Sequence, residues 1–205
     1  MECSNKLLKV RRKRLDAEDA AKLNVVDMAL GFTAMMRLFE EGSKKKIRKQ
    51  VVDLLPAIYD CKSESEFRTI HNGFCEWGIK NVRRAERKKN GKVVKPSGPP
   101  SYGQMAKTLD VILHVVIRYA CYPDSKMAEV ILKWLNTAMD TKMMAFLSSY
   151  YPDVLTHWPK TIEQVKTREQ YDVIQNTVRQ FIQEEHRGNI TPIDFDDIYW
   201  RALNN

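Results

Sequence analysis

The sequence predicts an all-α fold: a single-domain helical bundle of about seven helices around a central apolar helix at residues 102–121. Three observations support this prediction. Apolar residues recur at spacings of three and four along most of the chain, whereas no segment alternates convincingly as a strand would. Helix-capping residues stand before several of these runs. The composition, with 43% hydrophobic and 29% charged residues in 205, is that of a globular chain long enough for one real core.

The first half of the chain combines a basic tail with three predicted helices. Residues 1–15 are expected to form a basic flexible tail, and residues 16–205 the helical domain. Asp16 is suited to cap the first helix, and Ser63 with Glu66 fits a capping box before the third. Pro56 is expected to kink the second helix or to start a new turn. These helices are expected at residues 17–41, 44–60 and 64–89.

The second half begins after a break at residues 90–100. Asn90-Gly91 is compatible with a small hairpin turn, but no adequate strands flank it, so we predict a loop there. This basic loop divides a basic N-terminal half from a near-neutral C-terminal half. Ser101 and Gln104 form another capping box, and the helix behind it is the most apolar in the chain. The helices of this half are expected at residues 102–121, 127–135, 140–150, 162–186 and 194–203.

The charge distribution is the strongest indication of function. The net charge is +8, but residues 1–100 carry 23 Lys and Arg against 13 Asp and Glu, whereas residues 101–205 carry 11 against 13. A chain with one basic half of this kind favours a polyanionic partner, DNA or RNA above all. The candidate nucleic-acid-binding residues are Arg11, Arg12, Lys13, Arg14, Lys44, Lys45, Lys46, Lys80, Arg83, Arg84, Arg87, Lys88, Lys89, Lys92 and Lys95.

The clusters indicate contact with the phosphate backbone and give little indication of base specificity, although a helix-turn-helix, whose sequence signal is weak, stays open. No zinc finger, RNP motif or basic zipper is present in the sequence. If the clusters converge in space, affinity should fall steeply as salt rises. Two alternatives stay open: the positive charge meets an acidic protein partner, or it only keeps the surface solvated. The sequence is also compatible with a homo-oligomer.

An enzymatic alternative rests on one helix of the second half. Arg179 and His186 are seven residues apart and therefore share a helix face. This Arg-x6-His spacing resembles the signature of the HEPN superfamily of helical ribonucleases and nucleotide-handling proteins. The resemblance implies metal-independent RNA cleavage, in which Arg179 would stabilise negative charge and His186 would move a proton. Gln180 departs from the Asn, Asp or His that is usual after the arginine, and a solvated helix face explains the same residues.

Other polar groups favour structural interpretations. Asp110, His114 and Arg118 stand at i, i+4 and i+8 on the central helix, and we expect a satisfied polar seam more than a catalytic pair. The acidic residues Asp194, Asp196 and Asp197 suit a helix N-terminus, so no metal and no cofactor are expected. The common nucleotide, hydride and hydrolase motifs are missing from the sequence, which weakens the case for an enzyme.

Cysteine use and hydropathy indicate the compartment. Cys3, Cys61, Cys75 and Cys121 form no CxxC pair and no zinc-finger spacing with histidine. No stretch approaches 18 uninterrupted apolar residues, so no membrane partner is expected. A reducing, cytoplasmic setting fits these features best.

Overall fold

Helices build most of the chain that the structure describes. The structure is a computed structural model that describes residues 17–204, with the side chains of residues 20–203. The predicted tail 1–15, with Arg11, Arg12, Lys13 and Arg14, lies outside the described residues. The α-helices are α2 (Ala17–Phe32), α3 (Glu41–Asp60), α4 (Glu64–Asn81), α5 (Tyr102–Leu113), α6 (Ser125–Leu132), α7 (Thr141–Tyr150), α8 (Arg168–His186) and α9 (Pro192–Asn204). The predicted all-α fold is confirmed, and these helices form one domain.

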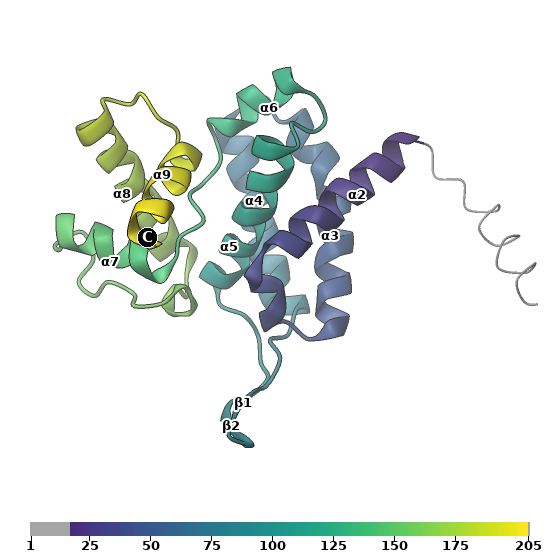
Figure 1. Ribbon diagram of the computed structural model, residues 1–205, viewed down its shortest axis with the longest axis vertical. Helices are drawn as coiled ribbons and strands as arrows, with labels where there is room; N and C mark the ends of the chain where they lie inside the picture. Colours follow the sequence, from purple (N-terminus) through teal and green to yellow (C-terminus); the bar gives the residue numbers. More distant parts are fainter. Residues whose placement is uncertain (1–16, 205) are drawn as a thin grey trace, which may run out of the picture.

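Helix α5 lies at the centre, as its apolar sequence predicts. Every residue of α5 except Lys107 and Val111 is buried. Helices α2 and α4 pack against it on one side, with α3 packed on α2 and α4, and α7, α8 and α9 group on the other side (Figure 1). Ser101 and Gln104 form the predicted capping box at its start. Gly78 of α4 permits the close approach, because a β-carbon there would stand 2.3 Å from the Met105 side chain.

The predicted helix over residues 102–121 changes character before its end. Helix α5 ends at Leu113 and continues as the π-helical turn η2 (His114–Tyr119). The π-turn begins only at His114, whose backbone N–H donates to the Asp110 carbonyl, so these two residues are still one regular helical turn apart. Asp110 faces His71 and Tyr171, whereas His114 lies against Asp196 and Asp197.

Other predicted helices differ from the observed ones mainly at their ends. The expected helix 17–41 is α2 followed by the 3₁₀ turn η1 (Ala34–Leu38). The expected helix 162–186 is the short 3₁₀ turn η3 (Ile162–Gln164) followed by α8, which Thr167 caps. Helix α3 runs through Pro56 as one helix, and α4 ends at Asn81, well before the predicted residue 89.

The loop predicted over residues 90–100 is wrong for its first half, because a β-hairpin stands there. Strand β1 (Arg87–Lys89) pairs antiparallel with β2 (Lys92–Lys95), and the hairpin projects from the helical body (Figure 1). Asn90 and Gly91 both have positive φ, at 52° and 74°, as a type I′ turn requires. The turn and the anchored base organise strands in which only Val93 and Val94 have a strong preference for β-structure.

Candidate nucleic-acid interface

The base of the hairpin is tied firmly to the helical body. Arg84 forms isolated bridges with Phe39 on one side and Gly98 on the other, and Ala85 N–H donates to the Leu38 carbonyl at 2.8 Å. Ser97 Oγ donates to Glu40 Oε1 at 2.6 Å. Segments from both ends of the hairpin are therefore held by the stretch that joins η1 to α3, and the ribbon beyond them projects from a fixed base.

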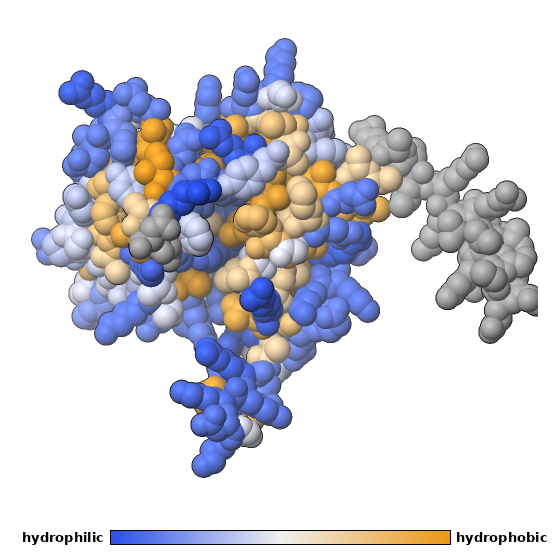
Figure 2. Space-filling model, viewed as in Figure 1, coloured by the Kyte–Doolittle hydropathy of each residue, from blue (hydrophilic) through white to orange (hydrophobic). Residues whose placement is uncertain are grey.

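The strands of the hairpin are basic and exposed. All residues of β1 are exposed, and so are those of β2 except the half-buried Lys95. The space-filling view shows the projection as predominantly hydrophilic (Figure 2). Val93 and Val94 are 51% and 55% exposed, so even the apolar residues of the ribbon find little cover within residues 17–204. An isolated two-stranded ribbon is marginal by itself, so these strands contribute little to the stability of the fold.

Like charges stand opposite each other across the ribbon. The register pairs Lys89 with Lys92 and Arg87 with Lys95. Directly opposed like charges destabilise a strand pair. Burial, together with the nearby cations Arg84, Lys166 and Arg87, lowers the pKa of Lys95. The hairpin thus concentrates positive charge beyond what its own structure needs.

Acidic residues offset only part of this charge. Glu163 of η3 forms ion pairs with Lys95 and with Arg84, the latter at 3.4 Å. Glu86 pairs with Lys88 at 3.1 Å, but both side chains are largely exposed, so the pair is weak. Arg84 is half-buried, and its Nε also donates to the Pro99 carbonyl. Arg84 is thus engaged in holding the hairpin base.

A groove beside the hairpin base brings two of the predicted clusters together. The N-terminal turn of α3 and the C-terminal end of α4 meet there, where Ser43 Oγ accepts the Arg83 backbone N–H at 2.8 Å. The groove has a volume of about 460 Å³, and the cations that line it are Lys46, Lys80 and Arg83. Lys46 Nζ donates to the carbonyl of Asn81, the last residue of α4, at 3.1 Å. This hydrogen bond gives a terminal carbonyl of the helix a donor and keeps the ammonium group at the groove.

Lys44 and Lys45 lie elsewhere on α3. Lys44 pairs with Glu41 at 3.2 Å, and both lysines line a shallow depression with Leu30, Met36 and Arg48. Because a helix turns by about 100° per residue, three consecutive lysines cannot share one face. The structure therefore brings Lys46, Lys80 and Arg83 together beside the hairpin and separates Lys44 and Lys45 from them.

The pair behind the enzymatic alternative is divided between two neighbourhoods. Arg179 Nη2 donates to Asn136 Oδ1 at 3.1 Å and lies 3.7 Å from Glu64 Oε1. His186 Nε2 instead lies 2.9 Å from the Tyr199 hydroxyl of α9. Both side chains are half-buried and have partners within the fold. The structure does not bring this arginine and histidine to one cavity.

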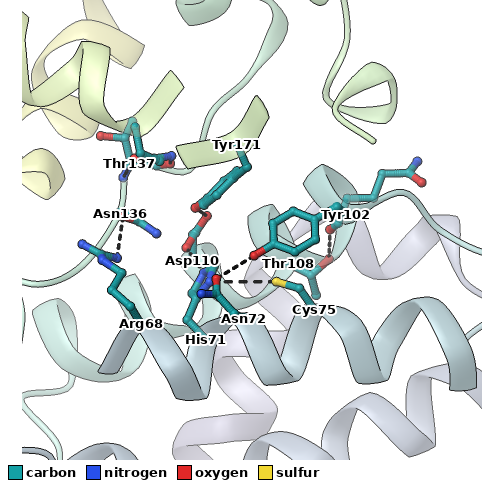
Figure 3. A network of polar contacts seen from close by, with 12 residues as sticks. Arg68, His71, Asn72, Cys75, Tyr102, Thr108, Asp110, Asn136, Thr137 and Tyr171 are labelled. Carbon is teal, nitrogen blue, oxygen red and sulfur yellow. Dashed lines mark hydrogen bonds and ion pairs between the residues drawn. The ribbon is translucent and has the colours of Figure 1, made fainter. Parts of the chain in front are cut away.

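A polar network in the core accounts for several other titratable residues (Figure 3). His71 Nε2 lies 2.8 Å from Asp110 Oδ1, and the Tyr171 hydroxyl donates to Asp110 Oδ2 at 2.6 Å. Beside them, the Tyr102 hydroxyl donates to Asn72 Oδ1 at 2.7 Å. Burial lowers the pKa of His71, but the adjacent Cys75 thiol and Asp110 carboxylate outweigh it and raise that pKa to about 10. Imidazolium and carboxylate thus satisfy one another, and we interpret the network as structural.

The acidic residues of α9 have separate roles. Asp194 Oδ2 accepts the Thr191 backbone N–H at 2.9 Å at the start of α9, and Asp194 also pairs with Arg118. Asp196 and Asp197 flank His114. Among residues 17–204, no group of three or more His, Cys, Asp or Glu side chains is arranged to hold a metal ion. Within the same range, no helix combines the length and apolar character needed to cross a bilayer.

Comparisons with protein families, curated proteins and solved structures give no match to this chain. The groove itself was missed by reasoning from sequence, because Ser43 and Arg83 are 40 residues apart. The hairpin had one signal in the sequence, the Asn90-Gly91 turn.

Proposed function

We propose that the protein binds nucleic acid through the phosphate backbone and that the β1–β2 hairpin makes the main contact. The register of the hairpin carries this proposal: it sets Lys89 opposite Lys92 and Arg87 opposite Lys95. An arrangement that costs stability in the free protein is favourable once phosphates stand between or beside these cations. Lys46, Lys80 and Arg83 extend the positive surface from the hairpin base into the groove.

The shape of the projection favours duplex DNA as the partner. The major groove of B-DNA admits a two-stranded β-ribbon, whereas the major groove of A-form RNA is too narrow for side chains to read. The hairpin stands clear of the helical body and presents exposed side chains along both strands (Figure 1). Lysine and arginine at these positions suit phosphate contact, so we expect binding with little sequence preference.

Fluorescence anisotropy with labelled single- and double-stranded DNA and RNA, across a salt series, tests the proposal. We expect the tightest binding to duplex DNA. The logarithm of the affinity should fall linearly with the logarithm of the salt concentration, with a slope of about −0.9 for each phosphate contacted. Flat anisotropy with all four ligands at roughly 0.1 M salt, where close contacts survive screening, would refute it. In that case an acidic protein that co-purifies with the chain would take the place of nucleic acid as the partner.

The thiols are consistent with a reducing compartment for this activity. Cys61, Cys75 and Cys121 are free, and the first two are buried. We propose a cytoplasmic setting on this ground, since structural disulfides are typical of oxidising compartments.

A further inference from the structure

A second cavity lies on the helical body, between the end of α2, the α5–η2 junction and α9. Its volume is about 380 Å³, within the range of small-molecule sites. Three large aromatic residues, Phe32, Tyr119 and Trp200, line it, and so do the polar residues Lys107, His114 and Asp197. None of these residues is among the predicted nucleic-acid contacts.

The aromatic residues give the cavity walls that suit a planar ligand. Phe32 is 69% exposed, Tyr119 54% and Trp200 50%. The Phe32 and Tyr119 ring centroids are 6.4 Å apart, and Tyr119 stacks on His114 at 4.9 Å. Apolar side chains of α2 are also open to solvent on the face shown in Figure 2. A gathering of exposed aromatic rings at one cavity marks a binding site more often than singly scattered ones do.

The polar side of the cavity is held in place by a histidine between two carboxylates. His114 Nδ1 lies 3.5 Å from Asp196 Oδ2, and Nε2 lies 3.5 Å from Asp197 Oδ1. The Tyr119 hydroxyl donates to that same Asp197 oxygen at 2.9 Å. Asp196 is buried, whereas the Asp197 side chain is 34% exposed and can accept a further hydrogen bond. His114 Nε2 is buried and has no hydrogen-bond partner among the described residues, so the wall of the cavity holds an unsatisfied polar atom beside Asp197.

Lys107 adds a donor to the same cavity. Its side chain is half-buried, and burial lowers its pKa against the opposing effect of Asp140 and Asp196. The lining holds two basic residues, Lys107 and Arg201, and two carboxylates, Asp196 and Asp197, so neither sign of charge predominates. A neutral ligand with both donors and acceptors suits this lining better than a phosphate does.

We propose that this cavity binds a planar nitrogen heterocycle that carries an amino group, such as adenine or cytosine, as a free nucleoside or as an unstacked base of a single strand. The ring stacks against the aromatic walls. The amino N–H donates to Asp197, and the adjacent ring nitrogen accepts from Lys107. The single-strand form rests on the proposed function, whereas the nucleoside form does not.

Matched nucleoside pairs test the proposal by isothermal titration calorimetry with the full chain. Adenosine against inosine, and cytidine against uridine, replace the amino group by a carbonyl oxygen at nearly constant size. We expect the amino member of at least one pair to bind about tenfold more tightly, because the carbonyl oxygen would face Asp197 without a proton between them. Equal affinities within both pairs, or no binding of any nucleoside or strand, would overturn the proposal.

Two substitutions check that the binding is at this cavity. Tyr119→Ala should weaken binding of the preferred nucleoside by about tenfold, as expected for the loss of a stacking ring. Tyr150→Ala is the matched control, because Tyr150 is also 54% exposed but lies on α7 and is not in the lining. Asp197→Asn should reduce the preference for the amino member, since an amide can donate to a carbonyl oxygen. An unchanged preference in Asp197→Asn would contradict the assignment.

Single strands distinguish the source of the base. If the ligand is a base within a strand, an oligonucleotide of cytosine should bind more tightly than one of uracil, and Tyr119→Ala should remove the difference. If the ligand is a free nucleoside, the two strands should bind equally while the nucleosides differ. Nucleosides carry no phosphate, so their binding does not depend on the hairpin. The nucleoside titrations therefore remain a valid test even if the proposed phosphate contact is refuted.

Discussion

The hairpin and the core network hold their charges in opposite ways. In the core, Asp110 stands between His71 and Tyr171, and each oxygen of its carboxylate has a partner. On the hairpin, Lys89 stands opposite Lys92, and both are exposed. The first arrangement stabilises the fold, whereas the second costs stability in the free protein. This difference separates charges that the fold uses from charges that remain for the phosphate contact proposed above.

The largest effect is expected from breaking the core network. Asp110→Ala leaves the buried His71 cation and the Tyr171 hydroxyl without their acceptor, and should lower the free energy of unfolding by about 3–5 kcal/mol. Asp172→Ala is the control, because Asp172 forms only an exposed i, i+4 pair with Arg168 and should cost less than about 1 kcal/mol. Urea denaturation measures both, and equal costs would show that the network does not hold the core.

A pH dependence of stability should follow from the same network. The folded-state pKa of His71 is raised to about 10 from an ordinary value of 6.5, so the folded state binds more protons than the unfolded state between these values. The stabilisation is present in full below pH 6.5 and is lost as pH rises toward 10. We expect the free energy of unfolding to fall by roughly 2–3 kcal/mol between pH 6.5 and 9. His71→Gln should flatten this dependence, and a rise of stability with pH would contradict it.

A smaller effect is expected at Arg179. Arg179→Ala removes the hydrogen bond to Asn136 and the contact with Glu64, and should lower the free energy of unfolding by about 1–3 kcal/mol. Gln180→Ala, on the exposed side of the same helix, serves as the control. Incubation with RNA should show no cleavage by the wild type. Cleavage that is lost in both Arg179→Ala and His186→Ala would instead establish the HEPN-like alternative.

The smallest effect on stability is expected on the hairpin. Lys89→Gln relieves the repulsion with Lys92. The free energy of unfolding should therefore be unchanged or higher by about a few tenths of a kcal/mol. Calorimetry of the variant and the wild type at low salt measures this. A clear loss of stability would show that the lysine has a structural role.

The features that could be predicted from sequence are those that neighbouring residues determine. The capping box joins Ser101 to Gln104, three residues apart, and the apolar face of the central helix follows from its own spacing. The partners of Asp110 are 39 and 61 residues away, so no local pattern reveals them. The hairpin was missed because RKK and KVVK are short and show no alternation of apolar and polar residues, and the turn with positive φ at Asn90 and Gly91 organises them. The partners of His114 on α9 are likewise more than 80 residues away along the chain, so its spacing from Asp110 does not reveal them.

Anisotropy with labelled duplex DNA tests the central claim most directly when two charge-matched variants are compared. The first replaces Lys88, Lys89 and Lys92 of the hairpin by glutamine, and the second replaces the exposed Lys126, Lys133 and Lys160 in the same way. Both lower the net charge equally. We predict that the hairpin variant loses at least about tenfold in affinity, while the control stays close to the wild type. The slope of log affinity against log salt should become shallower in the hairpin variant, by an amount that corresponds to up to roughly three lost phosphate contacts. Equal losses in the two variants would show that net charge, and not the hairpin, attracts the nucleic acid.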